Sequence, residues 1–216
     1  MANLVEEVAL LAYRDDNGRN TAPYLQWSLA GAALLELSLR GRVGVDDSGR
    51  VGVVDETPVG HVALDEVLTR VAGSNIGHIV SSWVQILSGT DIRTPVLEGL
   101  VDQRILTHDR DRLLGFIPVN RYHPAEASVE DEIRARLERA LAHSAGVDVR
   151  TAALAGVIAA TFMEKAAMPQ HKFGEVNKTF KELGRAPEIK PIVEGVELAV
   201  NIFRSGSGSA SVVVTS

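Results

Sequence analysis

Hydrophobic residues recur at helical spacing along most of the chain. The pattern predicts helices over residues 4–13, 24–39, 62–71, 78–87, 92–101, 129–141, 150–163, 176–183 and 192–203. The segment 24–39 is apolar almost all round, which places it at the centre of a bundle, and 150–163 should also be buried. Helix 129–141 carries charged residues opposite its apolar face and is predicted at the surface. The sequence therefore predicts a mainly α-helical single domain.

Two segments have the pattern of β-hairpins instead. Valines alternate with small or polar residues over 43–54, around a turn of Asp and Gly at 46–49. Short apolar runs at 104–107 and 113–119 flank the charged residues 108–111, which we expect to form the turn of a second hairpin. Residues 205–216 are rich in Gly and Ser and are expected to form a flexible tail after a domain that spans 1–204.

Composition narrows the classes of function. The formal charge of 22 minus 28, or -6, argues against coating nucleic acid, so an anionic partner must meet a local basic patch. The chain has no cysteine, which excludes disulfides and thiolate metal sites. Glu6 and Glu7 stand where a signal peptide would carry Lys or Arg, and no apolar run approaches ~18 residues. We expect a cytoplasmic protein that meets a membrane, if at all, from its surface.

Motifs for catalysis or cofactor binding are not found. The six histidines lack the paired spacing of a helical zinc site, and no Gly-rich run has the spacing that holds a phosphate. We therefore expect no metal, no cofactor and no enzyme activity. A small-molecule enzyme stays open as an alternative, because a buried pocket of scattered Glu, His and Arg cannot be seen in sequence.

Arginines near predicted turns are the remaining candidates for ligand binding. Their planar donor groups suit phosphate or carboxylate oxygens, but neighbouring aspartates offer ion pairs as the alternative. The set is Arg19, Arg40, Arg42, Arg93, Arg104, Arg110 and Arg112.

Four strings, taken together, resemble the Golgi phosphoprotein 3 family, whose members are peripheral Golgi membrane proteins with many bacterial relatives. The strings are LVEEVALL at 4–11, ELSLRGRV at 36–43, TPVG at 57–60 followed by LDEVL at 64–68, and LVDQRIL at 100–106. The resemblance runs in order from about residue 4 to 203.

The resemblance implies a helical domain on the cytoplasmic face of a membrane and a pocket for phosphatidylinositol 4-phosphate. The family builds that pocket from one tryptophan and three arginines, which fall here on Thr21, Ala30, Thr90 and Arg93. Arg93 alone matches, and a small shift would let Tyr24 or Trp27 replace the aromatic residue. We therefore expect Arg93 to bind acidic headgroups with little preference for phosphatidylinositol 4-phosphate.

The resemblance also implies partners. Anionic lipid or a phosphoinositide, a protein partner and a second copy of the chain are all expected. A family hairpin implicated in self-association and membrane contact corresponds here to Leu113, Leu114, Phe116 and Ile117. The alternative for this hairpin is that it only covers the core, and the alternative function is a soluble protein-interaction scaffold without lipid binding.

Overall fold

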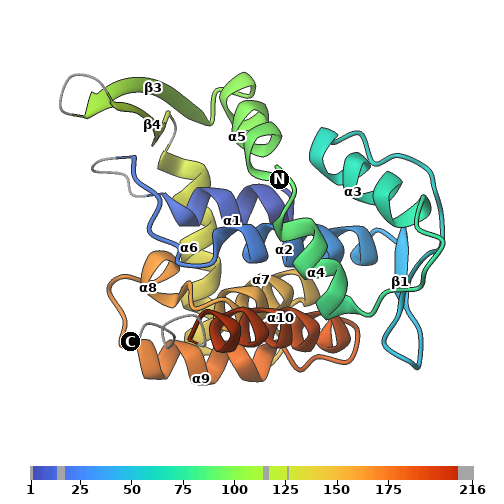
Figure 1. Cartoon of the computed structure of the whole chain (residues 1–216). Coiled ribbons are helices and arrows are strands. Elements are labelled where there is room, and N and C mark those ends of the chain that lie inside the picture. Colours follow the sequence, from blue (N-terminus) through green and yellow to red (C-terminus); the bar gives the residue numbers. More distant parts are fainter. Residues whose placement is uncertain (1, 14–17, 114–116, 126, 209–216) are drawn as a thin grey trace, which may run out of the picture.

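The computed structural model describes residues 2–13, 18–113, 117–125 and 127–208. In these ranges the predicted fold class is confirmed, because helices form most of the structure (Figure 1). The helices are α1 (Leu4–Ala12), α2 (Leu25–Leu39), α3 (Val62–Ala72), α4 (Val80–Ser88), α5 (Arg93–Asp102), α6 (Ala127–Ala142), α7 (Val149–Ala160), α8 (Glu164–Ala167), α9 (Phe173–Leu183) and α10 (Lys190–Gly208). Within the described ranges, none of these helices is long and apolar enough to span a membrane.

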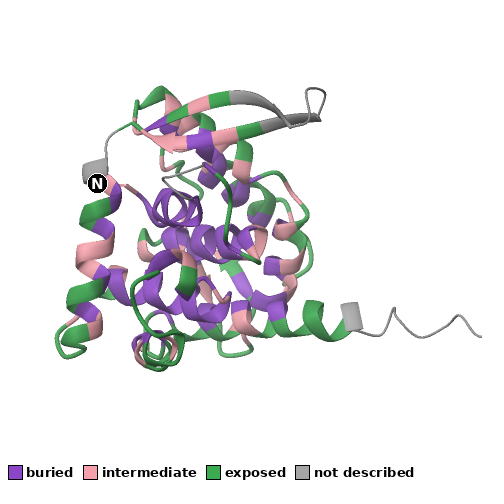
Figure 2. Cartoon of the chain, turned by 90° about the vertical axis from the view of Figure 1, so that its left-hand side faces the viewer, coloured by how far each residue is buried: buried purple, intermediate pink, exposed green. Residues whose placement is uncertain are grey.

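Helix α2 lies at the centre of the bundle, as its uniform apolar pattern predicts. Leu29, Leu34 and Leu35 are fully buried, and α2 contacts α1, α4, α7 and α10 (Figure 2). Gly31 lets α10 approach closely, because a Cβ added there would lie 2.5 Å from Cγ2 of Val196. Burial of apolar surface at ~25 cal/mol per Å² makes this packing the main source of stability.

Glu36 joins α1 and α7 to α2 inside the core. Its fully buried carboxylate accepts hydrogen bonds from the Leu4 N–H at 2.9 Å, Arg150 at 2.8 Å and Arg40 at 2.6 Å. Burial raises the pKa of Glu36, but the Leu4 N–H and the two arginines outweigh burial and leave the pKa below its ordinary value. Glu36 is therefore an ionised anchor between three helices.

Helix α1 is buried along its whole length. Asn3 caps it by accepting the N–H groups of Val5 and Glu6, while the Glu6 carboxylate accepts the Asn3 N–H at 2.8 Å. The Glu7 carboxylate is 1% exposed and accepts a hydrogen bond from Arg136 of α6 at 2.7 Å. Acidic side chains of α1 thus bind to groups on neighbouring helices instead of facing water.

Two antiparallel ribbons lie at the edge of the helical body (Figure 1). Strands β1 (Val43–Val45) and β2 (Val51–Val53) form the first, with its turn at the predicted Asp and Gly residues. In the second, β3 (Leu106–Leu113) pairs with β4 (Ile117–Pro124), with Leu113 opposite Ile117. The prediction of a turn at 108–111 is wrong, because these residues lie within β3. The charged residues within β3 interrupt the apolar and polar alternation that marks a half-buried strand.

Helix α6 is less exposed than its charges suggest. Glu130 is 4% exposed and accepts a hydrogen bond from Nε of Arg134 at 3.1 Å. Arg134 also donates to the carbonyl groups of Ala166 and Ala167 at α8, so this pair connects α6 with α8. The prediction that the charged face of this helix lies at the surface is therefore wrong for Glu130.

The last helix extends past the position where the sequence suggests a tail. Helix α10 continues through Gly208, whereas the Gly/Ser-rich segment begins at Ser205. The remaining residues of that segment, 209–216, lie outside the described part of the chain.

Candidate functional site

Arg93 is the first residue of α5 and is half-buried where α5 meets the end of α1. Its Nε donates a hydrogen bond to the Tyr13 hydroxyl at 2.6 Å, and its guanidinium carbon lies 5.7 Å from the centroid of the Tyr13 ring. Among the described residues, no ion pair is recorded for the two terminal nitrogens of Arg93. A guanidinium held through Nε can offer these two donors to a phosphate or carboxylate.

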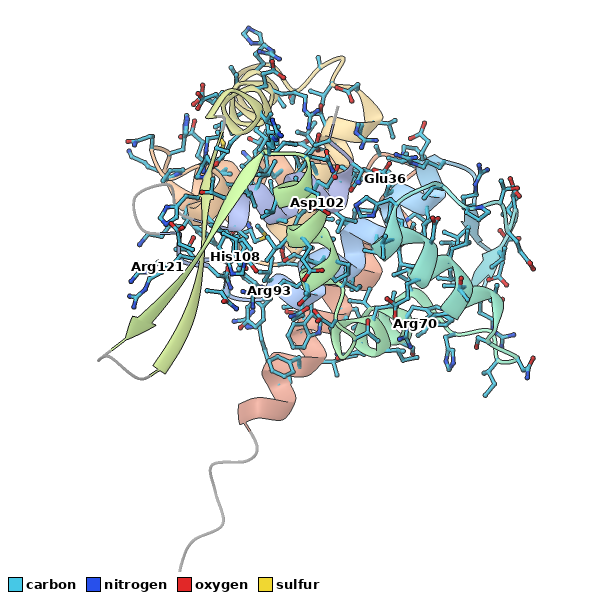
Figure 3. All side chains as sticks on the ribbon, turned by 90° about the horizontal axis from the view of Figure 1, so that it is seen from above. Glu36, Arg70, Arg93, Asp102, His108 and Arg121 are labelled. Atoms are coloured by element: carbon cyan, nitrogen blue, oxygen red, sulfur yellow. The ribbon has the colours of Figure 1, made fainter. Side chains whose placement is uncertain are left out.

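An aromatic row leads from Arg93 to the β3–β4 ribbon. The Tyr13 ring meets the Tyr122 ring edge to face at 5.4 Å, and Tyr122 stacks on the His108 ring at 4.6 Å. Figure 3 shows Arg93 and His108 close together where the ribbon passes α5, with Arg121 on the other side of the ribbon. We call Tyr13, Arg93, His108 and Tyr122 together the Arg93 surface.

The end of α1 and the chain after Gly18 position this aromatic row. Tyr13 forms a β-bridge with Asn20, and the Gly18 carbonyl accepts the Tyr122 N–H at 3.3 Å. Gly18 has a φ of 59°, and a Cβ there would lie 2.9 Å from the Tyr122 nitrogen. Only glycine lets this segment lie so close to β4, and this contact brings Tyr122 against Tyr13.

The electrostatics of the Arg93 surface favour a weak anion site. Burial raises the pKa of Tyr13, and the neighbouring Arg93 only partly opposes this shift, so Tyr13 is a neutral hydroxyl at physiological pH. Hydrogen bonds from the Thr94 hydroxyl and N–H hold the pKa of Asp91 below its ordinary value, and Arg93 adds to this effect. Asp91 is therefore ionised beside Arg93 and offsets part of its charge.

The three positions that differ from the family pattern, Thr21, Ala30 and Thr90, carry neither a cationic nor an aromatic side chain. Ala30 is fully buried in α2, so it cannot meet a ligand. Thr21 is exposed, and its N–H donates to the Ala12 carbonyl at 2.8 Å, while the Thr90 hydroxyl donates to the Leu87 carbonyl at 2.7 Å. Of the suggested aromatic replacements, Trp27 is half-buried, and it packs on Tyr24 and Phe203.

Two other candidate arginines are paired within the protein. Arg40 binds Glu36, and Arg42 binds Asp55 at 2.6 Å, so ion pairing is the correct interpretation for these two. The hairpin residues Leu113 and Ile117 face each other in the backbone register of β3 and β4, but their side chains lie outside the described set. Leu114 and Phe116 lie outside the described residues altogether.

Comparison with known proteins shows which family this chain belongs to. Residues 4–201 match the family model of Golgi phosphoprotein 3 (GPP34). This chain belongs to the Golgi phosphoprotein 3 family. It is also 32% identical over 160 residues to vacuolar protein sorting-associated protein 74 of Eremothecium gossypii, a match that covers 62% of this chain and 47% of that protein. The chain thus spans about half the length of this curated Golgi phosphoprotein 3 relative.

A second candidate site in this Golgi phosphoprotein 3 domain is a cleft of about 460 Å³ between α1 and α6. Glu7 lines it, and burial raises the Glu7 pKa although Arg136 opposes the shift. Gln103, Glu132, Arg136 and Arg139 are also polar residues of its lining. Within the described part of the chain, no group of acidic or His residues could hold a metal ion.

Sequence reasoning found Arg93 through the family resemblance but missed its neighbours. Tyr13 ends a buried helix and Tyr122 lies in a strand of mixed polar and apolar residues, so neither position signals a site. The only local indication is that Tyr13 is a polar aromatic residue at the end of an otherwise aliphatic helix. The Tyr122 and His108 contacts depend on the register of β3 with β4.

Proposed function

We propose that this Golgi phosphoprotein 3 family member binds acidic membranes peripherally, on the cytoplasmic side, through the Arg93 surface. The observation that carries the proposal is the Arg93 guanidinium, which Tyr13 holds at the molecular surface with two terminal donors available for lipid phosphate. Family membership supports a role in binding rather than catalysis.

The proposed binding is weak and depends on charge rather than headgroup identity. A chain of net charge -6 is repelled by an acidic membrane as a whole, so a local cation must supply the attraction. Thr21, Ala30 and Thr90 offer neither an aromatic face nor a guanidinium to recognise the 4-phosphate of an inositol ring. Acidic phospholipids of equal charge should therefore bind about equally well.

Replacing Arg93 with Gln should weaken binding to phosphatidylserine vesicles about fivefold, since one arginine near an acidic surface contributes ~1 kcal/mol. Co-sedimentation of the purified protein with vesicles at low and at high salt measures the effect. The difference between wild type and Arg93→Gln should shrink at high salt, because counterions screen exposed charges.

Arg70→Gln is the matched control for this measurement. Arg70 is a half-exposed arginine on α3 that pairs with Glu66 at 2.7 Å, and Figure 3 shows it well away from Arg93. Arg70→Gln changes the net charge by the same one unit as Arg93→Gln, and it should leave vesicle affinity unchanged. Equal losses from the two variants would mean that net charge, and not the Arg93 surface, controls binding.

A further inference from the structure

The distal end of α10 exposes large hydrophobic residues to solvent. Leu198 and Ile202, one helical turn apart, are 49% and 52% exposed, and Phe203 is 43% exposed. Ile86 on the neighbouring helix α4 is 42% exposed. In Figure 2 this end of α10 leaves the body of the molecule, with exposed residues around it. We call Ile86, Leu198, Ile202 and Phe203 the α10 stripe.

Aromatic residues pack against Phe203, at one end of the stripe. Trp27 packs against Phe203 with ring centroids 4.4 Å apart, and Tyr24 contacts both of them. Phe162 lies against Tyr24 although its φ is 57°, a backbone conformation that is costly for a bulky residue and must be held by its surroundings. The guanidinium carbon of Arg204 lies 4.5 Å from the centre of the Phe162 ring. This end of α10 is therefore built onto the domain and is not an isolated helical extension.

The charge of this end suits an acidic surface. Between residues 198 and 208, Arg204 is the only charged residue. Tyr and Trp rings beside apolar residues and an arginine are the composition found where proteins meet the boundary between lipid headgroups and acyl chains. Long arginine side chains can lie along such a boundary with the charge among the phosphates.

Helix α4 packs against α10 and leads along the chain toward Arg93. A Cβ at Gly195 would lie 2.4 Å from Val80, and Gln85 donates to the Ala199 carbonyl at 2.7 Å. Helices α4 and α10 therefore run side by side in the same direction, and the end of α4 leads into the segment that begins α5 at Arg93. In Figure 3 the distal end of α10 and the far ends of β3 and β4 extend from the body in the same general direction, while Figure 1 shows the ribbon above the helical body and α10 below it.

We propose that the α10 stripe enters the interfacial layer of the bilayer and acts as an apolar anchor in addition to the Arg93 surface. This inference rests on the membrane binding proposed above and adds a second contact of different chemistry. Four half-exposed side chains offer on the order of 300–400 Å², which is below the ~600 Å² or more that each partner contributes to a stable protein interface. A lipid surface, which needs no matching partner face, fits this small area better than a second copy of the chain.

The double variant Leu198→Ser/Ile202→Ser tests the anchor without disturbing the core, because both side chains are about half exposed. It should lower affinity for phosphatidylserine vesicles about tenfold, since each buried apolar side chain contributes to interfacial binding. The loss should persist at high salt, in contrast to the loss from Arg93→Gln. Val62→Ser/Ile76→Ser is the matched control, because these residues are 73% and 67% exposed elsewhere on the molecule.

A second measurement locates the anchor in the bilayer. The chain has no cysteine, so Ile202→Cys can carry a single environment-sensitive dye, with Ile76→Cys as its control. On phosphatidylserine vesicles containing lipids brominated on the acyl chain, the dye at residue 202 should shift to the blue and be quenched. The dye at residue 76 should remain in water under the same conditions.

The outcomes separate this inference from the proposed function. If the protein binds acidic vesicles while the dye at residue 202 stays in water, the anchor is wrong and membrane binding through Arg93 stands. If no acidic vesicle is bound, both proposals are wrong. If Leu198→Ser/Ile202→Ser turns a dimer into a monomer in light scattering and leaves vesicle affinity unchanged, a second copy covers the stripe and the lipid anchor is overturned.

Discussion

Replacing Glu36 with Gln should lower the free energy of unfolding by about 3 kcal/mol, because removal of one partner from a buried ion pair leaves the other charges uncompensated. Arg150, Arg40 and the Leu4 N–H all bind this one carboxylate. Thermal unfolding should then occur roughly 6–12 °C lower for a chain of this size. Chemical and thermal denaturation followed by circular dichroism measure both quantities.

The pH dependence of this effect has a defined sign. The folded pKa of Glu36 lies below the ordinary value of 4.5, so the stabilisation is present above that pH and is lost as the pH falls. The difference in free energy of unfolding between wild type and Glu36→Gln should be largest at pH 7 and should shrink below about pH 4.5. Glu66→Gln is the control, since Glu66 is half exposed and its pair with Arg70 should contribute less than ~1 kcal/mol. If this difference in free energy of unfolding grew at low pH, Glu36 would not be an ionised anchor.

Gly31→Ala should destabilise the protein by about 2 kcal/mol, although alanine normally favours a helix over glycine. The added Cβ would stand 2.5 Å from Cγ2 of the fully buried Val196, so α2 and α10 would have to move apart. Urea unfolding of the variant gives the change in free energy.

Two further variants separate crowding from other effects of Gly31→Ala. Gly99→Ala changes a helical glycine with no atom within 4 Å of the added Cβ, so it should be neutral or slightly stabilising. Val196→Ala removes the methyl groups that meet residue 31, so the double variant Gly31→Ala/Val196→Ala should be more stable than the sum of its single changes. Additive losses would show that contact with Val196 is not the cause.

The helical body was predictable because its apolar residues repeat with a clear period. Helix α2 is central since nearly every position in it is apolar, and the β1–β2 turn follows from the Asp and Gly residues at 46–49. The β3–β4 turn was misplaced because a run of charged residues within a strand resembles a turn. Glu130 was misplaced because a buried pair with Arg134, four residues away, looks in sequence like an ordinary surface pair.

The site was less predictable than the fold. Arg93 came from the family resemblance, and no local pattern distinguishes it from Arg70 or Arg42. Its bond to Tyr13 joins residues 80 positions apart in the chain, and the stacking of His108 on Tyr122 requires the register of a ribbon whose turn was misplaced. Such long-range contacts depend on tertiary packing, which periodicity does not report.

The central claim is that this surface binds acidic membranes by charge, and titration of the wild-type protein with three kinds of vesicle tests it most directly. One vesicle is neutral phosphatidylcholine, and the other two carry phosphatidylserine or phosphatidylinositol 4-phosphate at equal total charge. We expect similar, salt-sensitive binding to both acidic vesicles and much weaker binding to the neutral one. Absence of binding to either acidic vesicle, or tight binding confined to phosphatidylinositol 4-phosphate, would contradict the account.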